Sequence, residues 1–138
     1  MRTVGFFREL GPDPVEVYAE SIHAHLVSEP LPDAHRVTDY LRDGHGLIDV
    51  MGAELDVLGS GRHLVGGASV MTDGKWTWRD DLRFYVVTYH VRLPEDLLTS
   101  IRANDYRVPE LRIEDLRAAG KEAIRLLGYH RPPAPSLR

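Results

Sequence analysis

Residues 70–101 read VMTDGKWTWRDDLRFYVVTYHVRLPEDLLTSI and contain a hairpin turn, both tryptophans and two helix starts. Asp73-Gly74 lies between two β-prone runs, and residues that tolerate a positive φ suit the tight turn of a two-residue hairpin loop. Such a loop places Met71 opposite Trp76. Because side chains alternate along a strand, Trp76 and Trp78 share one face, and we expect that face to belong to the core.

The length and composition are those of one globular domain. The chain has 138 residues, of which 43% are hydrophobic and 28% charged. This length is enough to bury roughly two thirds of the surface that the unfolded chain exposes. We expect a single domain over residues 1–130 and a disordered, proline-rich tail over 131–138, because the tail has too few apolar groups to offset the entropy of ordering.

No apolar run approaches the roughly 20 residues that a membrane span needs, and Arg8 and Glu9 interrupt the only candidate for a signal-peptide core. The absence of cysteine excludes disulfides and thiolate chemistry and fits a reducing compartment. We therefore expect a cytoplasmic protein that contacts no membrane.

Charge is spread unevenly around a net value of −4. Residues 1–101 hold nine Lys and Arg against sixteen Asp and Glu, whereas residues 102–138 hold eight against five. Nucleic-acid binding depends on clustered basic residues that neutralise phosphates, so the acidic front of the chain argues against a nucleic-acid partner.

Capping residues and helical periodicity predict five helices. The first runs from Asp13-Pro14 to about Ser28, and the second begins at Asp33 and ends at Gly44 in a left-handed cap. The third starts at Asp80 or Asp81 and the fourth at Pro94. The fifth covers residues 113–127, and Gly128 closes it.

Between the second and third helices the period becomes strand-like. Short runs at 47–51, 54–58, 63–72 and 75–79 are separated by loops too short for a crossover helix, so we expect neighbouring runs to pair antiparallel. A further short strand is expected within residues 3–10. The predicted fold class is α+β, in which an antiparallel β-meander sheet of about three to five strands packs one face on helices from the two ends of the chain.

Seven histidines raise the question of a metal site or a general base. His45, Asp49 and His63 lie on or beside neighbouring predicted strands, and His90 follows the third helix. These four are candidate catalytic residues, although turn, edge and helix-terminus positions explain them equally well. His23 and His25 are two residues apart on a predicted helix and point away from each other, so we expect no metal site and no cofactor.

Aromatic residues crowd around the hairpin and the third helix, and two interpretations stay open. The first is packing between the sheet and the helix. The second is an aromatic-walled groove for a partner, since Trp and Tyr give large contact area with little rotamer entropy to lose. The candidate binding residues of such an acidic, aromatic surface are Asp73, Trp76, Trp78, Arg79, Asp80, Asp81 and Tyr85.

The segments GFFREL at 5–10 and TDGKWTW at 72–78, with YHVRLP at 89–94, resemble a family of small actinobacterial proteins of the Streptomyces type. The similarity covers roughly half to two thirds of the chain. It brings no activity with it, and no catalytic residue is carried over.

These observations favour a non-catalytic, cytosolic protein-binding module of the immunity, adaptor or regulatory type. The alternative is a small-molecule-binding protein or small enzyme, with a His/Asp acid-base pocket between the sheet and the third helix. We lean away from an enzyme, since no catalytic motif is complete, and expect a protein partner before a small molecule.

Overall fold

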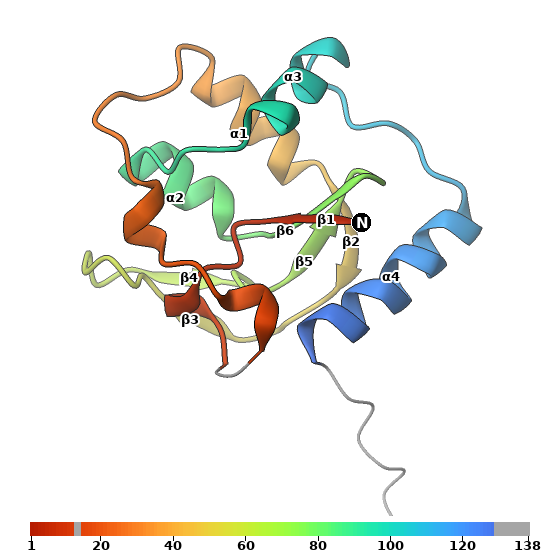
Figure 1. The fold of residues 1–138 in the computed structure, drawn as a ribbon, viewed down its shortest axis with the longest axis horizontal. Coiled ribbons are helices and arrows are strands. Elements are labelled where there is room, and N and C mark those ends of the chain that lie inside the picture. Colours follow the sequence, from red (N-terminus) through yellow and green to blue (C-terminus); the bar gives the residue numbers. More distant parts are fainter. Residues whose placement is uncertain (13–14, 129–138) are drawn as a thin grey trace, which may run out of the picture.

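The computed structural model describes residues 1–12 and 15–128, and its fold is α+β, as the sequence predicts (Figure 1). A four-stranded sheet has the order β1-β6-β5-β2, and β3 and β4 form a separate two-stranded sheet. The strands are β1 (Arg2–Val4), β2 (His45–Ile48), β3 (Ala53–Leu55), β4 (His63–Val65), β5 (Val70–Thr72) and β6 (Trp76–Arg79). The helices are α1 (Ala34–Arg42), α2 (Leu82–Tyr89), α3 (Glu95–Ala103) and α4 (Ile113–Leu127). The predicted tail at 131–138 lies outside the described residues.

The β5–β6 hairpin keeps the predicted faces but not the predicted register. Met71 pairs with Trp78 and Thr72 with Thr77, so the connection is longer than the two-residue loop expected. Asp73 closes this wider turn, because its Oδ1 accepts hydrogen bonds from the backbone N–H of Lys75 at 2.9 Å and of Trp76 at 2.8 Å. A shift of two residues preserves the strand alternation, and both tryptophans therefore still face the core.

Strand β1 adds to the sheet from the far end of the chain. It pairs parallel with β6, with Arg2 beside Trp76 and Val4 beside Trp78. The remaining pairs of this sheet, β2 with β5 and β5 with β6, are antiparallel. The meander order is wrong at β2, which pairs with β5 and not with β3, the next strand along the chain, because β3 and β4 form their own sheet. The result is a mixed sheet whose single parallel pair joins residues more than seventy positions apart.

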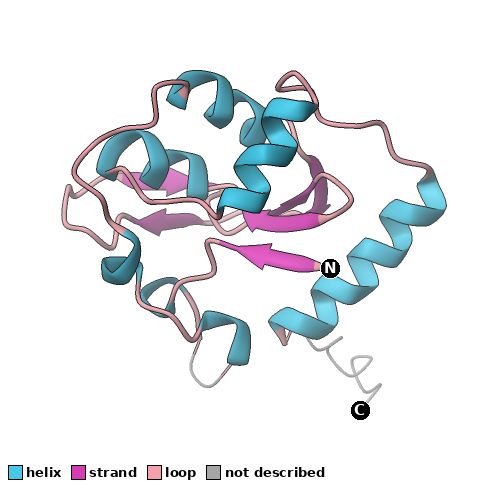
Figure 2. Cartoon of the chain, turned by 45° about the horizontal axis from the view of Figure 1, so that its top comes forward, coloured by secondary structure: helices cyan, strands magenta, loops and turns pink. Residues whose placement is uncertain are grey.

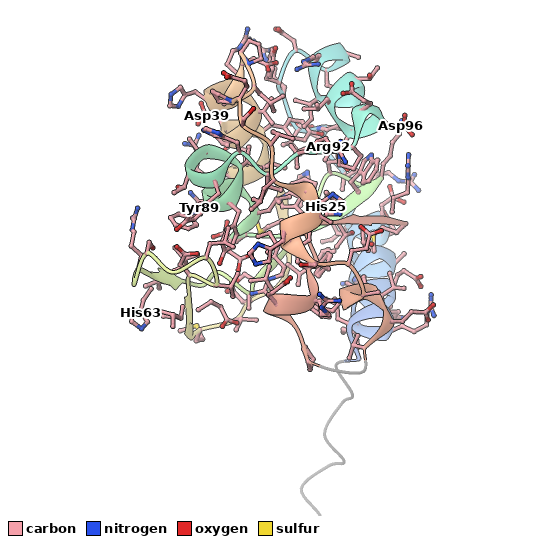
Figure 3. The ribbon with its side chains drawn as sticks, turned by 60° about the vertical axis from the view of Figure 1, so that its left-hand side comes forward. His25, Asp39, His63, Tyr89, Arg92 and Asp96 are labelled. Carbon is pink, nitrogen blue, oxygen red and sulfur yellow. The ribbon has the colours of Figure 1, made fainter. Side chains whose placement is uncertain are left out.

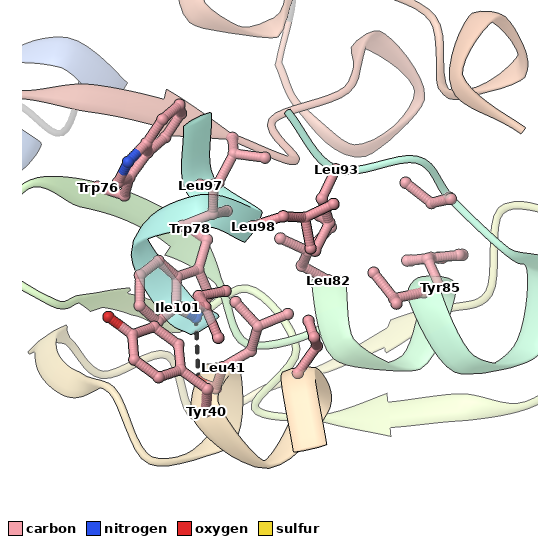
Figure 4. Close-up of a cluster of buried hydrophobic side chains, with 14 of the residues drawn as sticks. Tyr40, Leu41, Trp76, Trp78, Leu82, Tyr85, Leu93, Leu97, Leu98 and Ile101 are labelled. Carbon is pink, nitrogen blue, oxygen red and sulfur yellow. Dashed lines mark hydrogen bonds between the residues drawn. The ribbon is translucent and has the colours of Figure 1, made fainter. Parts of the chain in front are cut away.

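Helices cover both faces of the sheet. Helices α1, α2 and α3 pack on the tryptophan face, and α4 lies apart from them (Figure 2). The main core includes Tyr40, Leu41, Trp78, Leu82, Tyr85, Leu97, Leu98 and Ile101, all of which Figure 4 labels. A smaller cluster of Phe6, Tyr18, Val70, Ala123 and Leu127 fills the opposite side, beneath α4.

The predicted first helix is wrong over its described part. Residues 15–28 instead form two short 3-10 helices, η2 (Glu16–Tyr18) and η3 (Ile22–His25), with extended backbone at Ser21. A continuous helix would place Tyr18 and Ile22 on one face, but Tyr18 enters the smaller cluster and Ile22 the main core. The chain has to break between them to reach both sides of the sheet. The expected cap at Asp13-Pro14 lies outside the described residues.

Two further predictions are corrected, one for a helix end and one for a strand. Gly44 is not a left-handed terminator, because α1 ends at Arg42, its C-cap Asp43 has a φ of −85°, and Gly44 is not among the positive-φ glycines. A Cβ at Gly44 would meet Trp78 Cζ2 at 2.6 Å, so the residue is small to admit the indole. The run 63–72 is not one strand either, since Gly66 turns the chain with a φ of +69° and separates β4 from β5.

Candidate functional site

The aromatic residues expected at a binding surface lie in the core. Trp78 and Tyr85 are 0% exposed and Trp76 is 4% exposed. The Trp78 indole donates to the carbonyl of Leu41 at 3.0 Å, and the Tyr85 hydroxyl accepts from the backbone N–H of Val57 at 3.0 Å. The sheet-to-helix packing interpretation therefore describes this cluster, and these rings present no face to a partner in this structure.

Asp73, another candidate binding residue, is also buried. Besides its turn hydrogen bonds, it accepts one from the Tyr40 hydroxyl at 2.6 Å. Burial, together with the neighbouring Asp73 carboxylate, raises the pKa of Tyr40 far above its usual value. With its two oxygens engaged by the turn and by Tyr40, the Asp73 carboxylate holds the hairpin on α1.

Arg79 and Asp81 form a buried ion pair that ties three segments together. Arg79 also donates to the carbonyl of Leu10 at 2.9 Å and lies 3.5 Å from a carboxylate oxygen of Glu54. Burial raises the pKa of Asp81 to about 6, although its pairing with Arg79 opposes this shift. The remaining acidic candidate, Asp80, pairs with Arg83 at 3.2 Å on the surface. Asp81 therefore cannot serve as an exposed acidic rim.

The candidate catalytic residues are spread over different elements. His45 on β2 bonds the carbonyl of Pro109 at 2.7 Å, whereas His63 is exposed on the separate β4 and Asp49 is exposed between β2 and β3. His90 is the left-handed cap of α2, with a φ of 59°. Within residues 1–12 and 15–128 no hydrogen bond or ion pair joins any two of them, and no group of three or more His, Asp or Glu is arranged to hold a metal ion.

An exposed apolar face on the β3–β4 pair is the feature that sequence reasoning missed. Met51 is 90% exposed, Val65 81% and Leu55 55%. Ala53 pairs with Val65 and Leu55 with His63, so these side chains project together from one side of the pair. We call Met51, Ala53, Leu55, His63 and Val65 the outward face. Figure 3 shows His63 at the outer margin of the molecule.

The other side of the β3–β4 pair is fastened to the domain. Leu64 packs against the main core, and Glu54 reaches Arg79. At the end of the hairpin, the Tyr89 hydroxyl donates to Asp56 at 2.6 Å. Strand alternation alone predicts that Glu54 and Leu64 lie on one side of the pair and Leu55 and Val65 on the other. It does not predict which of the two sides the rest of the domain covers.

Two of the cavities that open on the surface of the described part of the chain have volumes in the range of small-molecule sites. One, of about 580 Å³, lies between the hairpin turn at Asp73–Lys75, the end of α3 and the inner side of α4. The other, of about 560 Å³, lies between β1 with its following turn, η2 and the segment at 92–94. His25 and Arg92 line the second cavity. Neither residue was a candidate in the sequence. His25 was placed on the predicted first helix, which does not form over its described part.

No family model, curated protein or solved structure matches this chain. In the part of the chain that the structure describes, no helix is both long enough and apolar enough to cross a bilayer.

Proposed function

We propose that this protein is a non-catalytic, cytosolic protein-binding module of the immunity, adaptor or regulatory type, and that it meets its partner through the outward face of the β3–β4 pair. The observation that carries the proposal is the exposure of Leu55 and Val65 on one side of this short sheet, with the 90% exposed Met51 two residues before β3. Burial of such exposed apolar side chains against another protein surface lowers the free energy, because it removes apolar area from water.

The contacts that hold the β3–β4 pair on the domain support an interface whose structure is already ordered in the free protein. The contacts of Glu54, Asp56 and Leu64 fix the inner side, while the turn at Gly66 is tied back by a 2.8 Å hydrogen bond from its N–H to the carbonyl of Gly52. A face that is already ordered loses little conformational entropy on binding, and this favours affinity.

The backbone of the pair offers a second kind of contact. Beyond β3 and β4 the described residues add no further strand to this sheet, so both strands are edges. In an antiparallel pair, alternate residues direct their N–H and C=O groups away from the partner strand. An extended segment of a partner protein could bond these groups while its apolar side chains cover the outward face.

The net charge of this chain indicates which charged residues would surround the apolar centre of the partner's binding surface. The first 101 residues, which include the β3–β4 pair, hold sixteen acidic side chains against nine basic ones. Such an excess favours a partner whose apolar centre is surrounded by Lys and Arg, and it accelerates their encounter at low salt.

The test is affinity capture from native lysate with the parent chain and two matched variants. Val65→Glu places a charge in the outward face, whereas Ile124→Glu places one at an exposed apolar position of α4, where Ile124 is 45% exposed. We expect a stoichiometric partner to be retained by the parent and by Ile124→Glu and lost with Val65→Glu, at equal thermal stability. Retention by both variants, or no stoichiometric partner on the parent, would refute the proposal.

A further inference from the structure

The cavity beside β1 combines an apolar floor with charges of both signs. Its apolar lining includes Val4, Phe6, Val17 and Leu93, and its charged lining comprises Glu16, Glu20, His25 and Arg92. The volume of about 560 Å³ lies in the range of small-molecule sites. It is separate from the outward face of β3–β4, so it does not depend on the function proposed above.

Hydrogen bonds between distant segments fix the walls of this cavity. The backbone N–H of Arg92 donates to the carbonyl of His25 at 2.7 Å, and that of Arg8 donates to the carbonyl of Glu20 at 2.7 Å. Figure 3 shows His25 and Arg92 as neighbours. The His25 ring is held on one side by a Glu20 carboxylate oxygen, 2.7 Å from Nε2, and on the other by the Phe7 ring at 5.4 Å.

Arg92 is a cation without an acidic partner at this site. Among the described residues, no side chain forms a hydrogen bond with its guanidinium group, and no carboxylate oxygen lies within 4.0 Å of it. Yet Glu16 and Glu20 line the same cavity, and Glu16 likewise makes no ion pair with a described residue. Arg92 and Glu16 therefore line one cavity without pairing with each other, whereas Glu20 pairs with His25.

We propose that this cavity binds a small zwitterion of the amino-acid or short-peptide class, with an apolar body. The planar guanidinium of Arg92 suits a carboxylate, since it can donate two parallel hydrogen bonds. Glu16 and the second oxygen of Glu20 accept from the ammonium group. The apolar floor at Val4, Val17 and Leu93 receives the side chain.

The charges also discriminate against other classes of ligand. A phosphate or other dianion would approach two glutamates for one arginine, and like charges disfavour it. A simple amine would pair with the glutamates, but it would leave Arg92 without an anionic partner and close to a second positive charge. A ligand that carries both signs offers a partner to Arg92 and to both glutamates.

The test is a titration of the full chain followed by backbone amide NMR. The ligands are leucine and the dipeptide Leu-Leu, beside 4-methylpentanoic acid, which lacks the ammonium group, and 3-methylbutylamine, which lacks the carboxylate. We expect a zwitterion to shift amides at 3–7, 16–20 and 92–93 with a Kd in the micromolar to millimolar class, and each single-charge analogue to bind about tenfold or more weakly. Stronger binding of leucine or of Leu-Leu distinguishes an amino-acid site from a peptide site.

Variants assign the charged groups. Arg92→Gln and Glu20→Gln are expected to weaken zwitterion binding about tenfold or more, whereas Arg107→Gln, an exposed arginine outside the cavity, leaves it unchanged. Arg92 is exposed, so its variant keeps the parent's urea midpoint. The proposal is overturned if no zwitterion shifts these amides up to about 10 mM, if the amine alone binds as well, or if Arg92→Gln binds like the parent.

Discussion

Arg79 and Asp81 form a two-pronged ion pair beneath the surface, with Nε 3.1 Å from Oδ1 and Nη2 2.9 Å from Oδ2. The two side chains are 2% and 0% exposed. The pair lies where the end of β6 meets the start of α2, and Arg79 also holds the N-terminal segment at Leu10. Loss of either charge leaves the other buried in a medium that solvates it poorly.

Asp81→Asn is therefore expected to lower the free energy of unfolding by about 3 kcal/mol or more, because it leaves the Arg79 guanidinium uncompensated. Asp80→Asn is the matched control, since Asp80 pairs with Arg83 at the surface and its loss should cost at most about 1 kcal/mol. Urea unfolding of the three proteins measures both values. Equal midpoints for Asp81→Asn and the parent would show that the pair contributes little.

Truncation of the central rings tests their assignment to the core. Trp76→Ala and Tyr85→Ala are each expected to cost about 3 kcal/mol or more through the cavity they leave. Tyr85→Phe removes only the hydroxyl that accepts from Val57, and should cost about 1 kcal/mol. The measurement is again the urea midpoint, and truncated variants as stable as the parent would place these rings at the surface.

Alanine at two glycines should have opposite effects. Gly44→Ala puts a Cβ 2.6 Å from Trp78 Cζ2 and 3.3 Å from Met71 Cβ, so we expect a loss of about 1 to 3 kcal/mol from overpacking. Gly120 lies inside α4 with open space around the new Cβ, and Gly120→Ala should gain up to about 1 kcal/mol in helix propensity. Thermal unfolding compares them, and a stabilising Gly44→Ala would contradict the close approach of the indole.

The pH dependence of stability should carry a signature of Asp33. Hydrogen bonds from Arg102, and then from Tyr106, hold the pKa of Asp33 at about 2, below its ordinary value of 3.8. Because the folded-state pKa is depressed, this stabilisation is complete above pH 3.8 and is lost as the pH falls through about 2. With Arg102 partly exposed to solvent, we expect about 1 kcal/mol.

Urea unfolding of the parent and of Asp33→Asn between pH 6 and about pH 2 checks this. The parent should be the more stable protein near neutrality, and the difference should shrink toward the acid end. A difference that is constant with pH would mean that ionisation of Asp33 plays no part.

Short-range signals in the sequence determined most of the regular structure. Proline, acidic and glycine residues at helix ends, together with the 3.6-residue period, predict α1, α2, α3 and α4, and α4 begins and ends at the predicted residues. The hairpin faces follow from alternation alone, so Trp76 and Trp78 reach the core even though the register differs by two residues. Each of these features depends only on neighbours a few positions away along the chain.

Only the tertiary structure decided the rest. The parallel pairing of β1 with β6, the break between Tyr18 and Ile22 and the separation of β4 from β5 depend on surfaces contributed by distant segments. The two candidate sites also depend on contacts between distant segments. The backbone N–H of Arg92 bonds the carbonyl of His25, 67 positions away, at the cavity beside β1. The ion pair of Glu54 with Arg79 holds one side of the β3–β4 pair on the domain and leaves the outward face exposed. Periodicity shows which side chains share a face, but burial is decided by what packs against that face.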